Sequence, residues 1–220
     1  FNYYTALHEV GHAVGLSHPF DGTGLGGTTL ADGKDFVRNT VMSYTSNDRN
    51  YYFVPNNTAN PTSISSERWY PTDPGLLDVN VIEHIYGTAT STNAGDTVYT
   101  FDDKPVFLRT LIDSGGTDTI DASNQTEEVV INLNGGTAAS IGIWSSAEQL
   151  AHYSSYGINA TATVANINAN QASGSHKSPF AKGWYEGIDN LQIPASSIIE
   201  NVKGGAKADI LTGNSSDNEI

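Results

Sequence analysis

Residues 8 to 18 read H-E-V-G-H-A-V-G-L-S-H, and this segment constrains the fold more than any other part of the chain. His8 and His12 are four positions apart, so a helix places both imidazoles on one face, one turn apart. Gly15 then allows the chain to leave the helix, because glycine tolerates the left-handed backbone of a C-cap. The turn that follows brings His18 round as a third ligand. Three protein nitrogens plus a water is the open arrangement of a catalytic zinc site.

The same segment supplies a general base. Glu9 follows the first histidine, and in the H-E-x-x-H pattern this glutamate can reach a water on the metal. A bare H-E-x-x-H arises by chance, but Gly15 and His18 complete the longer metzincin motif, and Pro19 follows directly. The alternative interpretation is three satisfied or surface histidines without a metal.

A second element supports the first. Residues 40 to 44 read T-V-M-S-Y and contain the single methionine of the chain. Metzincins have a tight turn with a methionine beneath the zinc ligands. A thioether is soft and apolar, so Met42 would pack under the imidazoles without competing strongly for zinc. Gly15 and Met42 are therefore predicted structural supports of the zinc site.

With both motifs in place, the chain resembles the serralysin branch of the metzincins (peptidase family M10), the calcium-stabilised secreted bacterial proteases. Residues 74–87 are similar to the helix that closes the catalytic domain of that family. Residues 95–99 (G-D-T-V-Y) resemble the opening of its calcium-binding C-terminal domain, and residues 115–121 and 131–134 are similar to segments there. The resemblance covers about residues 1–140 and 198–218.

The resemblance implies further site residues. Tyr44 matches the family's tyrosine two places after the methionine, whose phenol approaches the zinc and helps to stabilise the oxyanion, so it is a catalytic candidate and a candidate additional zinc ligand. Seven calcium-binding positions carry over, namely Gly95, Thr97, Asp113, Gly115, Asp118, Glu200 and Asp209. For the carboxylates in turns, simple turn chemistry is the alternative. The implied partners are protein or peptide substrates and a proteinaceous inhibitor, for a monomer exported by type I secretion to the extracellular space.

Residues 204–212 resemble the nonapeptide G-G-x-G-x-D-x-U-x, which forms a calcium-binding parallel β-roll. Lys207 occupies the usual second glycine position, which puts calcium binding at that half-site in question. Residues 213–217 resemble a further degenerate half-repeat. A pair of Gly/Asp turns without calcium is the alternative.

The expected fold class is α+β, a metzincin catalytic portion followed by an all-β calcium-binding domain like a parallel β-roll. Residues 1–88 are predicted to be the C-terminal portion of a zinc-protease domain whose N-terminal sheet is missing. Residues 89–220 are predicted to be the serralysin-type calcium-binding domain, with an insertion at about 141–197 and the start of RTX-like repeats at 204–220. On this interpretation the chain is a piece of a longer protein, truncated at both ends.

The local patterns predict the individual elements. Helices are expected over residues 1–17 and from Asp73-Pro74 to Gly87, and a long loop over 45–72. Short runs of β-branched residues bounded by Gly, Asp or Asn predict strands at 97–101, 106–108, 118–122 and 129–133, and residues 161–168 alternate like a strand. His152 and His176 in the insertion are interpreted as structural rather than metal-binding.

Composition excludes some classes of function. The chain carries 24 acidic and 10 basic residues, a net charge of −14 that argues against nucleic-acid binding. Acidic side chains in glycine-rich loops suit calcium, and a solubilising acidic surface is the alternative. There is no cysteine and hence no disulfide. No run of about 18 apolar residues predicts a membrane span, and no N-terminal signal sequence is recognisable.

The leading functional hypothesis is a zinc-dependent endopeptidase stabilised by calcium. One alternative is a calcium-binding surface or adhesion module whose protease domain is inactive or serves self-processing. Another is a β-rich binding module with a vestigial zinc helix.

Overall fold

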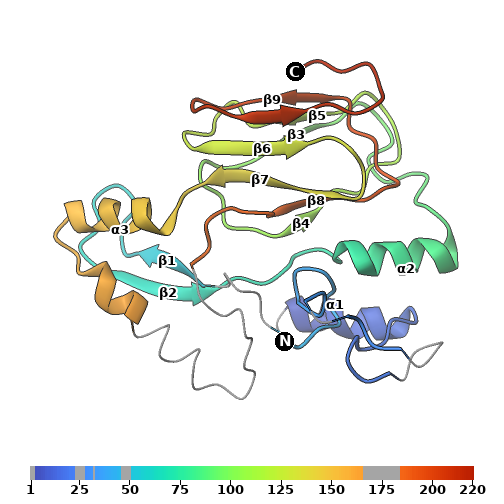
Figure 1. The fold of residues 1–220 in the computed structure, drawn as a ribbon, viewed down its shortest axis with the longest axis horizontal. Coiled ribbons are helices and arrows are strands. Elements are labelled where there is room, and N and C mark those ends of the chain that lie inside the picture. Colours follow the sequence, from blue (N-terminus) through green and yellow to red (C-terminus); the bar gives the residue numbers. More distant parts are fainter. Residues whose placement is uncertain (1–2, 23–27, 32, 46–50, 166–183) are drawn as a thin grey trace.

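The fold is mixed α+β, as the sequence predicts. The computed structural model describes residues 3–22, 28–31, 33–45, 51–165 and 184–220. The helices are α1 (Tyr3–Ala13), α2 (Leu76–Tyr86) and α3 (Ser146–Ser155), and the strands are β1 (Tyr51–Pro55), β2 (Ile64–Arg68), β3 (Val98–Thr100), β4 (Arg109–Thr110), β5 (Thr119–Asp121), β6 (Glu128–Asn132), β7 (Thr137–Ile143), β8 (Leu191–Ile193), β9 (Asn201–Lys203) and β10 (Ile210–Thr212). Helices α1 and α2 lie together on one side of the strands, and β1, β2 and α3 lie on another (Figure 1).

Helix α1 ends at Ala13, four residues before the predicted end at residue 17, because the chain already leaves the helix at the break that the sequence predicts at Gly15. Gly15 has φ +98°, which an L-residue rarely adopts. Its N–H donates to the carbonyl of His12 at 3.0 Å, and the N–H of Leu16 donates to the carbonyl of Gly11 at 2.9 Å. This pair of bonds is the Schellman arrangement of a helix C-terminus. It reverses the chain at once and returns it toward the helix.

The predicted loop over residues 45–72 is wrong in its middle. Strands β1 and β2 form an antiparallel hairpin there, with Tyr51 opposite Arg68. The part of that loop at residues 46–50 lies outside the described residues. The buried side chain of the hairpin, Phe53, packs against residues from the distant insertion. Tertiary contacts therefore determine this element.

Helix α2 begins two residues later than predicted. Its N-cap is Gly75, not Asp73. The carboxylate of Asp78, in the first turn, accepts the N–H of Gly75 at 2.8 Å and so satisfies a free donor at the helix start. The predicted C-terminus at Gly87 is confirmed, with φ +86°.

Three of the four predicted strands in the C-terminal half are confirmed, as β3, β5 and β6. The strand predicted at 106–108 is wrong, and β4 follows it instead. The N–H of Phe107 donates to the hydroxyl of Tyr185 at 3.1 Å, and that hydroxyl donates to the carbonyl of Phe107 at 2.9 Å. A side chain thus takes the place that a neighbouring strand would have.

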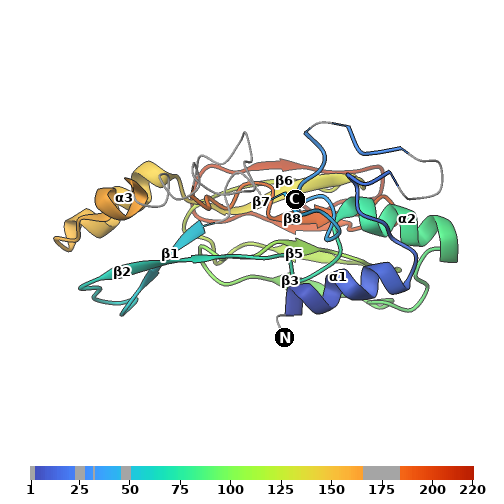
Figure 2. The same cartoon turned by 90° about the horizontal axis from the view of Figure 1, so that it is seen from below.

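The strands form two sheets beside the hairpin. One has the order β10-β6-β7-β8-β4 and the other the order β3-β5-β9. Strands β3 and β5 lie in a different layer from β6, β7 and β8 (Figure 2). A buried aliphatic core joins the two sheets, including Ile120 and Val202 from one and Ile131, Ile141 and Ile193 from the other. Pairing within β3-β5-β9, between β10 and β6 and between β4 and β8 is parallel. Strand β7 pairs antiparallel with both β6 and β8, so the five-stranded sheet departs from the expected parallel β-roll at its centre.

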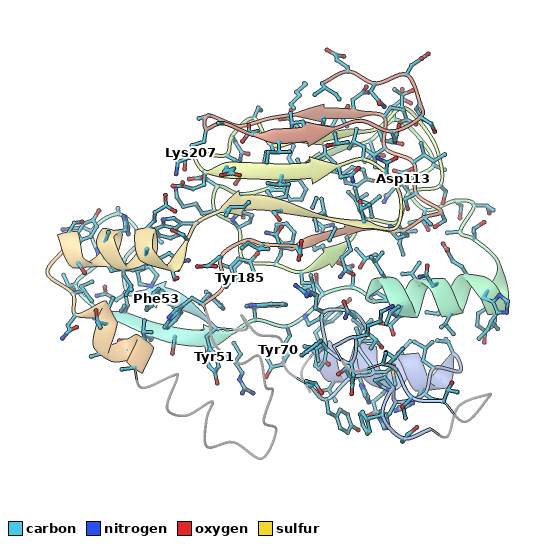
Figure 3. The ribbon with its side chains drawn as sticks, viewed as in Figure 1. Tyr51, Phe53, Tyr70, Asp113, Tyr185 and Lys207 are labelled. Atoms are coloured by element: carbon cyan, nitrogen blue, oxygen red, sulfur yellow. The ribbon has the colours of Figure 1, made fainter. Side chains whose placement is uncertain are left out.

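The insertion folds onto the hairpin. Phe53 of β1 stacks on Trp184 with ring centroids 3.8 Å apart, and its ring centroid lies 5.1 Å from that of Tyr153 on α3. Figure 3 shows Phe53 beside the helices of the insertion. Residues 160–165 are helical, so the predicted strand over 161–168 is wrong for its described part, and residues 166–168 lie outside the described residues. Ala160, at the start of this helical segment, is fully buried in the same cluster.

Of the two histidines in the insertion, His152 lies in the described part of the chain, and there it belongs to no group of three or more potential metal ligands. His152 lies on α3 against the rings of Trp144, Tyr153 and Tyr156. His176 lies outside the described residues. No helix among the residues described combines the length and the apolarity needed to cross a membrane.

We expect Phe53→Ala to lower the free energy of unfolding by about 3–5 kcal/mol, because it empties an aromatic stack that joins the hairpin to the insertion. Urea unfolding followed by tryptophan fluorescence measures the change. Tyr3→Ala is the matched control, since its side chain is 63% exposed and should change the stability by less than about 0.5 kcal/mol. Equal effects of the two substitutions would contradict the packing described.

Candidate metal centre

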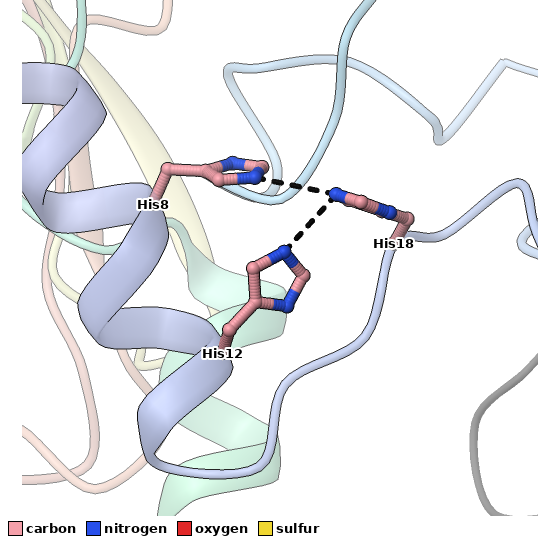
Figure 4. Close-up of side chains that lie close together, drawn as sticks. All are labelled: His8, His12 and His18. Atoms are coloured by element: carbon pink, nitrogen blue, oxygen red, sulfur yellow. Dashed lines mark hydrogen bonds between the residues drawn. The ribbon is translucent and has the colours of Figure 1, made fainter.

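The three motif histidines meet at one point. His8 and His12 come from α1, and His18 returns after the Gly15 turn (Figure 4). Nε2 of His18 lies 3.1 Å from Nε2 of His12 and 3.3 Å from Nε2 of His8. Tetrahedral zinc with Zn–N bonds of about 2.0–2.1 Å places its nitrogen ligands about 3.3–3.4 Å apart. Among the described residues, this is the only group of three or more His, Asp or Glu with ligand atoms within 4.8 Å of one another.

The outer nitrogens of the three rings fix their tautomers. Nδ1 of His8 lies 2.8 Å from the carbonyl oxygen of Val41, and Nδ1 of His12 lies 3.0 Å from that of Leu16. Nδ1 of His18 lies 3.1 Å from a carboxylate oxygen of Asp21. Carbonyl and carboxylate oxygens only accept, so each Nδ1 is placed as the donor, and a ring that is protonated at Nδ1 alone turns the lone pair of its Nε2 inward. Three lone pairs at this separation repel one another without a cation, so the donor set fits a metal.

Met42 lies directly under the helix that carries two of the ligands. Its side chain is 1% exposed. A Cβ placed on Gly11 would meet the sulfur of Met42 at 2.5 Å, so only glycine lets the helix approach the methionine this closely. Leu16 and Val41 complete the small apolar cluster. The placement agrees with the supporting role predicted for Met42.

Asp78 holds the methionine turn in place, and sequence reasoning missed it. Its carboxylate is 2% exposed and accepts the hydroxyl of Thr40 at 2.6 Å and the N–H of Val41 at 2.7 Å. Burial raises the pKa of Asp78, and its hydrogen bonds with Thr40, Val41 and Gly75 act in the opposite direction. Since Val41 also accepts from His8, Asp78 supports the position of a predicted metal ligand through one intervening residue.

The exposed side of the centre is aromatic. Tyr44 is 51% exposed, and its ring centroid lies 5.5 Å from that of His8 and 4.8 Å from that of His18. Phe20 stacks on His18 at 5.0 Å. Glu9 is exposed on α1, next to His8. The structure thus leaves the open side of the three nitrogens flanked by exposed rings and close in sequence to a carboxylate.

Six of the seven predicted calcium positions lie together. Each strand of the in-register parallel sheet β3-β5-β9 is directly preceded by one of three of these residues, Thr97, Asp118 and Glu200, so the three lie together at one end of the sheet. The N–H of Thr97 donates to Asp118 at 2.8 Å, and the N–H of Asp118 donates to Glu200 at 2.7 Å. Gly95 accepts from the hydroxyl of Thr97, and Asp113 accepts from the N–H of Gly115.

Burial and the neighbouring acids both disfavour the charged form of Asp118 in this cluster. Asp118 is fully buried, and its Oδ2 receives no hydrogen bond from the described residues. Burial, with Asp113 and Glu200 close by, raises the pKa of Asp118 to about 6. A buried carboxylate oxygen without a donor, beside two more acids, fits a hard cation such as calcium.

Asp209 lies apart from this cluster, at the opposite end of β9. Its two carboxylate oxygens accept the N–H of Val129 at 3.0 Å and the N–H of Gly205 at 2.6 Å. Lys207, at the predicted second glycine position, forms ion pairs with Glu127 and with Glu148 of α3. The repeat-like segment therefore holds a lysine ammonium between two acids.

The comparisons with known proteins agree with this geometry. A family model described as metallo-peptidase family M12B, reprolysin-like, matches residues 1–67, which contain the three histidines and the methionine turn. Metallopeptidase AprA of Pseudomonas marginalis is 29% identical over 98% of this chain and 38% of its own length. Serralysin of Proteus mirabilis is 28% identical over 98% of this chain and 36% of its own length. Serralysin C of Dickeya chrysanthemi is 33% identical over 63% of this chain and 30% of its own length.

The chain is related to the serralysin-type metzincins. The matching family model carries the name of M12B rather than M10, but the relatives that align with nearly the whole chain are serralysins and AprA. This serralysin relative spans less than two fifths of the length of the AprA and serralysin proteins just named.

Two further site residues have signals too weak to find from sequence alone. Asp21 stands three positions after His18, where an acid can reach back to the ring, but a carboxylate in a glycine-rich loop is common. Asp78 sits in the first turn of α2, where an acid is ordinary helix capping. Only the close approach of the methionine turn gives Asp78 its second role.

Asp78→Ala should destabilise the protein by about 3 kcal/mol or more, because three buried donors lose a charged acceptor. It should also weaken zinc binding, since the carbonyl of Val41 that orients His8 loses its anchor. Chemical denaturation and a competitive zinc titration measure the two effects. Asp73→Ala is the control: its carboxylate accepts the hydroxyl of the exposed Thr72 at 3.1 Å and forms a 3.8 Å ion pair with the half-exposed Arg109, so its loss leaves no buried donor unpaired. An Asp78 variant with normal stability and zinc affinity would contradict the role assigned to Asp78.

Proposed function

We propose that the protein is a zinc-dependent endopeptidase of the serralysin type that hydrolyses peptide bonds in protein substrates. The observation that supports this most is the convergence of three Nε2 lone pairs, each fixed by an acceptor at Nδ1. Zinc at this position would polarise a peptide carbonyl and acidify a water molecule. The metalloprotease names of the relatives support the same reaction.

The chain's own residues divide the remaining work. Glu9 takes the proton of the attacking water and returns it to the leaving amine as general base and acid. Tyr44, whose ring lies against His8 and His18, donates its phenol hydrogen to the developing oxyanion and is a candidate additional zinc ligand before substrate binds. Val41, Leu16 and Asp21 keep the imidazoles oriented.

We further propose that calcium binds at the end of the sheet β3-β5-β9 where Asp118 lies and stabilises it. The supporting observations are the three neighbouring acids Asp113, Asp118 and Glu200 and the Asp118 oxygen that receives no donor from the described residues. Asp209 would belong to a separate, repeat-like site, at which the ammonium of Lys207 already balances two acids.

We also propose that the protein is secreted and acts as a monomer that a proteinaceous inhibitor recognises, by analogy with its relatives.

The proposal places residues 1–88 in a catalytic portion and residues 89–220 in a calcium-binding β-roll-like portion. The parallel pairing of β3-β5-β9 and of β10 with β6 supports the second assignment. The two portions contact each other through buried Gln192, whose side chain accepts the N–H of Leu76 and donates to the carbonyl of Arg38.

Glu9→Ala in the full-length protein should retain one zinc per chain and lose at least about a hundredfold in kcat on a quenched peptide, the scale of a lost general base. Metal analysis and steady-state kinetics measure both quantities. Glu219→Ala, at an exposed position near the end of the described chain, is the control and should keep its activity. Unchanged hydrolysis by Glu9→Ala would refute the role of Glu9, and absence of hydrolysis in the unmodified protein would favour the binding-module alternative.

Chelation of calcium with EGTA should lower the melting temperature, because an ion that binds only the folded state at about 100 times its Kd adds about 2.7 kcal/mol of stability. Asp118→Asn should remove most of this shift, whereas Asp102→Asn, at an exposed position outside the predicted calcium positions, should keep it. The measurement is a calorimetric scan of the zinc-loaded protein with and without EGTA. A melting temperature that EGTA leaves unchanged would contradict the calcium assignment.

A further inference from the structure

Two large exposed rings stand beside the three-histidine centre. Phe20 is 42% exposed and Tyr44 is 51% exposed, although each is a side chain that folding normally buries. Phe20 follows the third ligand after a single residue, Pro19, which is buried. Exposed aromatic surface next to a candidate catalytic metal is a typical feature of ligand binding.

The rings form one continuous surface over the ligands. Phe20 lies parallel to His18, with centroids 5.0 Å apart and an interplanar angle of 8°. Tyr44 lies 5.0 Å from Phe20 and 4.8 Å from His18. We call Phe20 and Tyr44 together the aromatic rim. It stands directly beside the imidazoles whose Nε2 atoms converge.

The position of Phe20 is fixed before any ligand arrives. His18, on which it stacks, is held by the contact of its Nδ1 with Asp21 at 3.1 Å. The backbone at Pro19 is held as well, because its carbonyl accepts the N–H of Leu30 at 2.8 Å. A ring fixed in this way loses little conformational freedom on binding, which favours recognition.

We propose that Phe20 is a specificity-determining residue and that the aromatic rim binds a large apolar side chain of the substrate next to the scissile bond. The inference rests on the proposed peptidase activity, because a peptide whose carbonyl reaches the metal must pass its flanking side chains over these rings. An aromatic or branched aliphatic side chain gains ring contacts there. An acidic one is disfavoured by the nearby Asp21 and by the net charge of −14.

The first test compares quenched peptides that differ only in the residue flanking the cleaved bond, which is Phe, Leu, Ala, Lys or Asp. Phe20→Ala should lower kcat/KM about five- to tenfold for the Phe and Leu peptides, mainly through KM, and leave the Ala peptide within about twofold. Phe20→Leu should lie between the two. Tyr156→Ala, an equally exposed aromatic position that follows α3 on the far side of the molecule (Figure 1), is the control.

Three outcomes would overturn the proposal. An equal loss for all five peptides, together with weaker zinc binding in a competitive titration, would mean that Phe20 only supports His18. Unchanged kinetics for every peptide would mean that the rim does not contact substrate. A preference for the Lys peptide that disappears in Phe20→Ala would also overturn it, since the rim would then recognise a cation.

The second test does not depend on turnover. Calorimetry on the zinc-loaded protein compares two short peptide hydroxamates that differ only in a benzyl or a methyl side chain. The benzyl compound should bind about five- to tenfold more tightly, and Phe20→Ala should remove this difference. If the protein hydrolyses no peptide, the proposed function fails while this comparison still tests the rim. Equal affinities for the unmodified protein would overturn the rim proposal alone.

Discussion

Val41 connects the two helices on which the metal centre depends. Its carbonyl accepts from Nδ1 of His8 on α1, and its N–H donates to Asp78 on α2. The hydroxyl of Tyr4 contacts the same carbonyl at 3.2 Å. One residue of the methionine turn thus accepts from the Nδ1 of a predicted ligand and links the two helices. Without this contact, the lone pair of His8 would have no fixed direction, and the three nitrogens would not share a point.

Met42 and Asp78, next to Val41, also contact two elements each. Met42 fills the space beneath α1 that Gly11 leaves free, and the buried Asp78 satisfies both the turn and the start of α2. Each group serves two elements at once, so the site has few independent parts. A small displacement of the turn would therefore change ligand orientation, packing and helix capping together.

Acidic side chains come together at two places in the C-terminal half, and their electrostatic environments differ. At the end of the sheet where β3, β5 and β9 begin, Asp118 is buried beside Asp113 and Glu200, and burial raises the pKa of Asp118. At the other end of β9, Lys207 lies between Glu127 and Glu148 and so links the repeat-like turn to α3 of the insertion. We infer that the first arrangement needs an external cation, whereas the second carries its own.

The sequence alone determined the parts that depend on fixed local spacing. The helical period places His8 and His12 on one face, and Gly15 supplies the backbone freedom for the turn to His18, so the convergence of the three imidazoles was predictable. Strands β3, β5 and β6 were likewise predictable from short β-branched runs. Only the tertiary structure decided the β1–β2 hairpin, the helix at 160–165, the roles of Asp21 and Asp78 and the exposure of Phe20. These features arise from contacts between segments far apart in the chain or from backbone reversals, and a local pattern carries no information about which distant group will fill a space or accept a hydrogen.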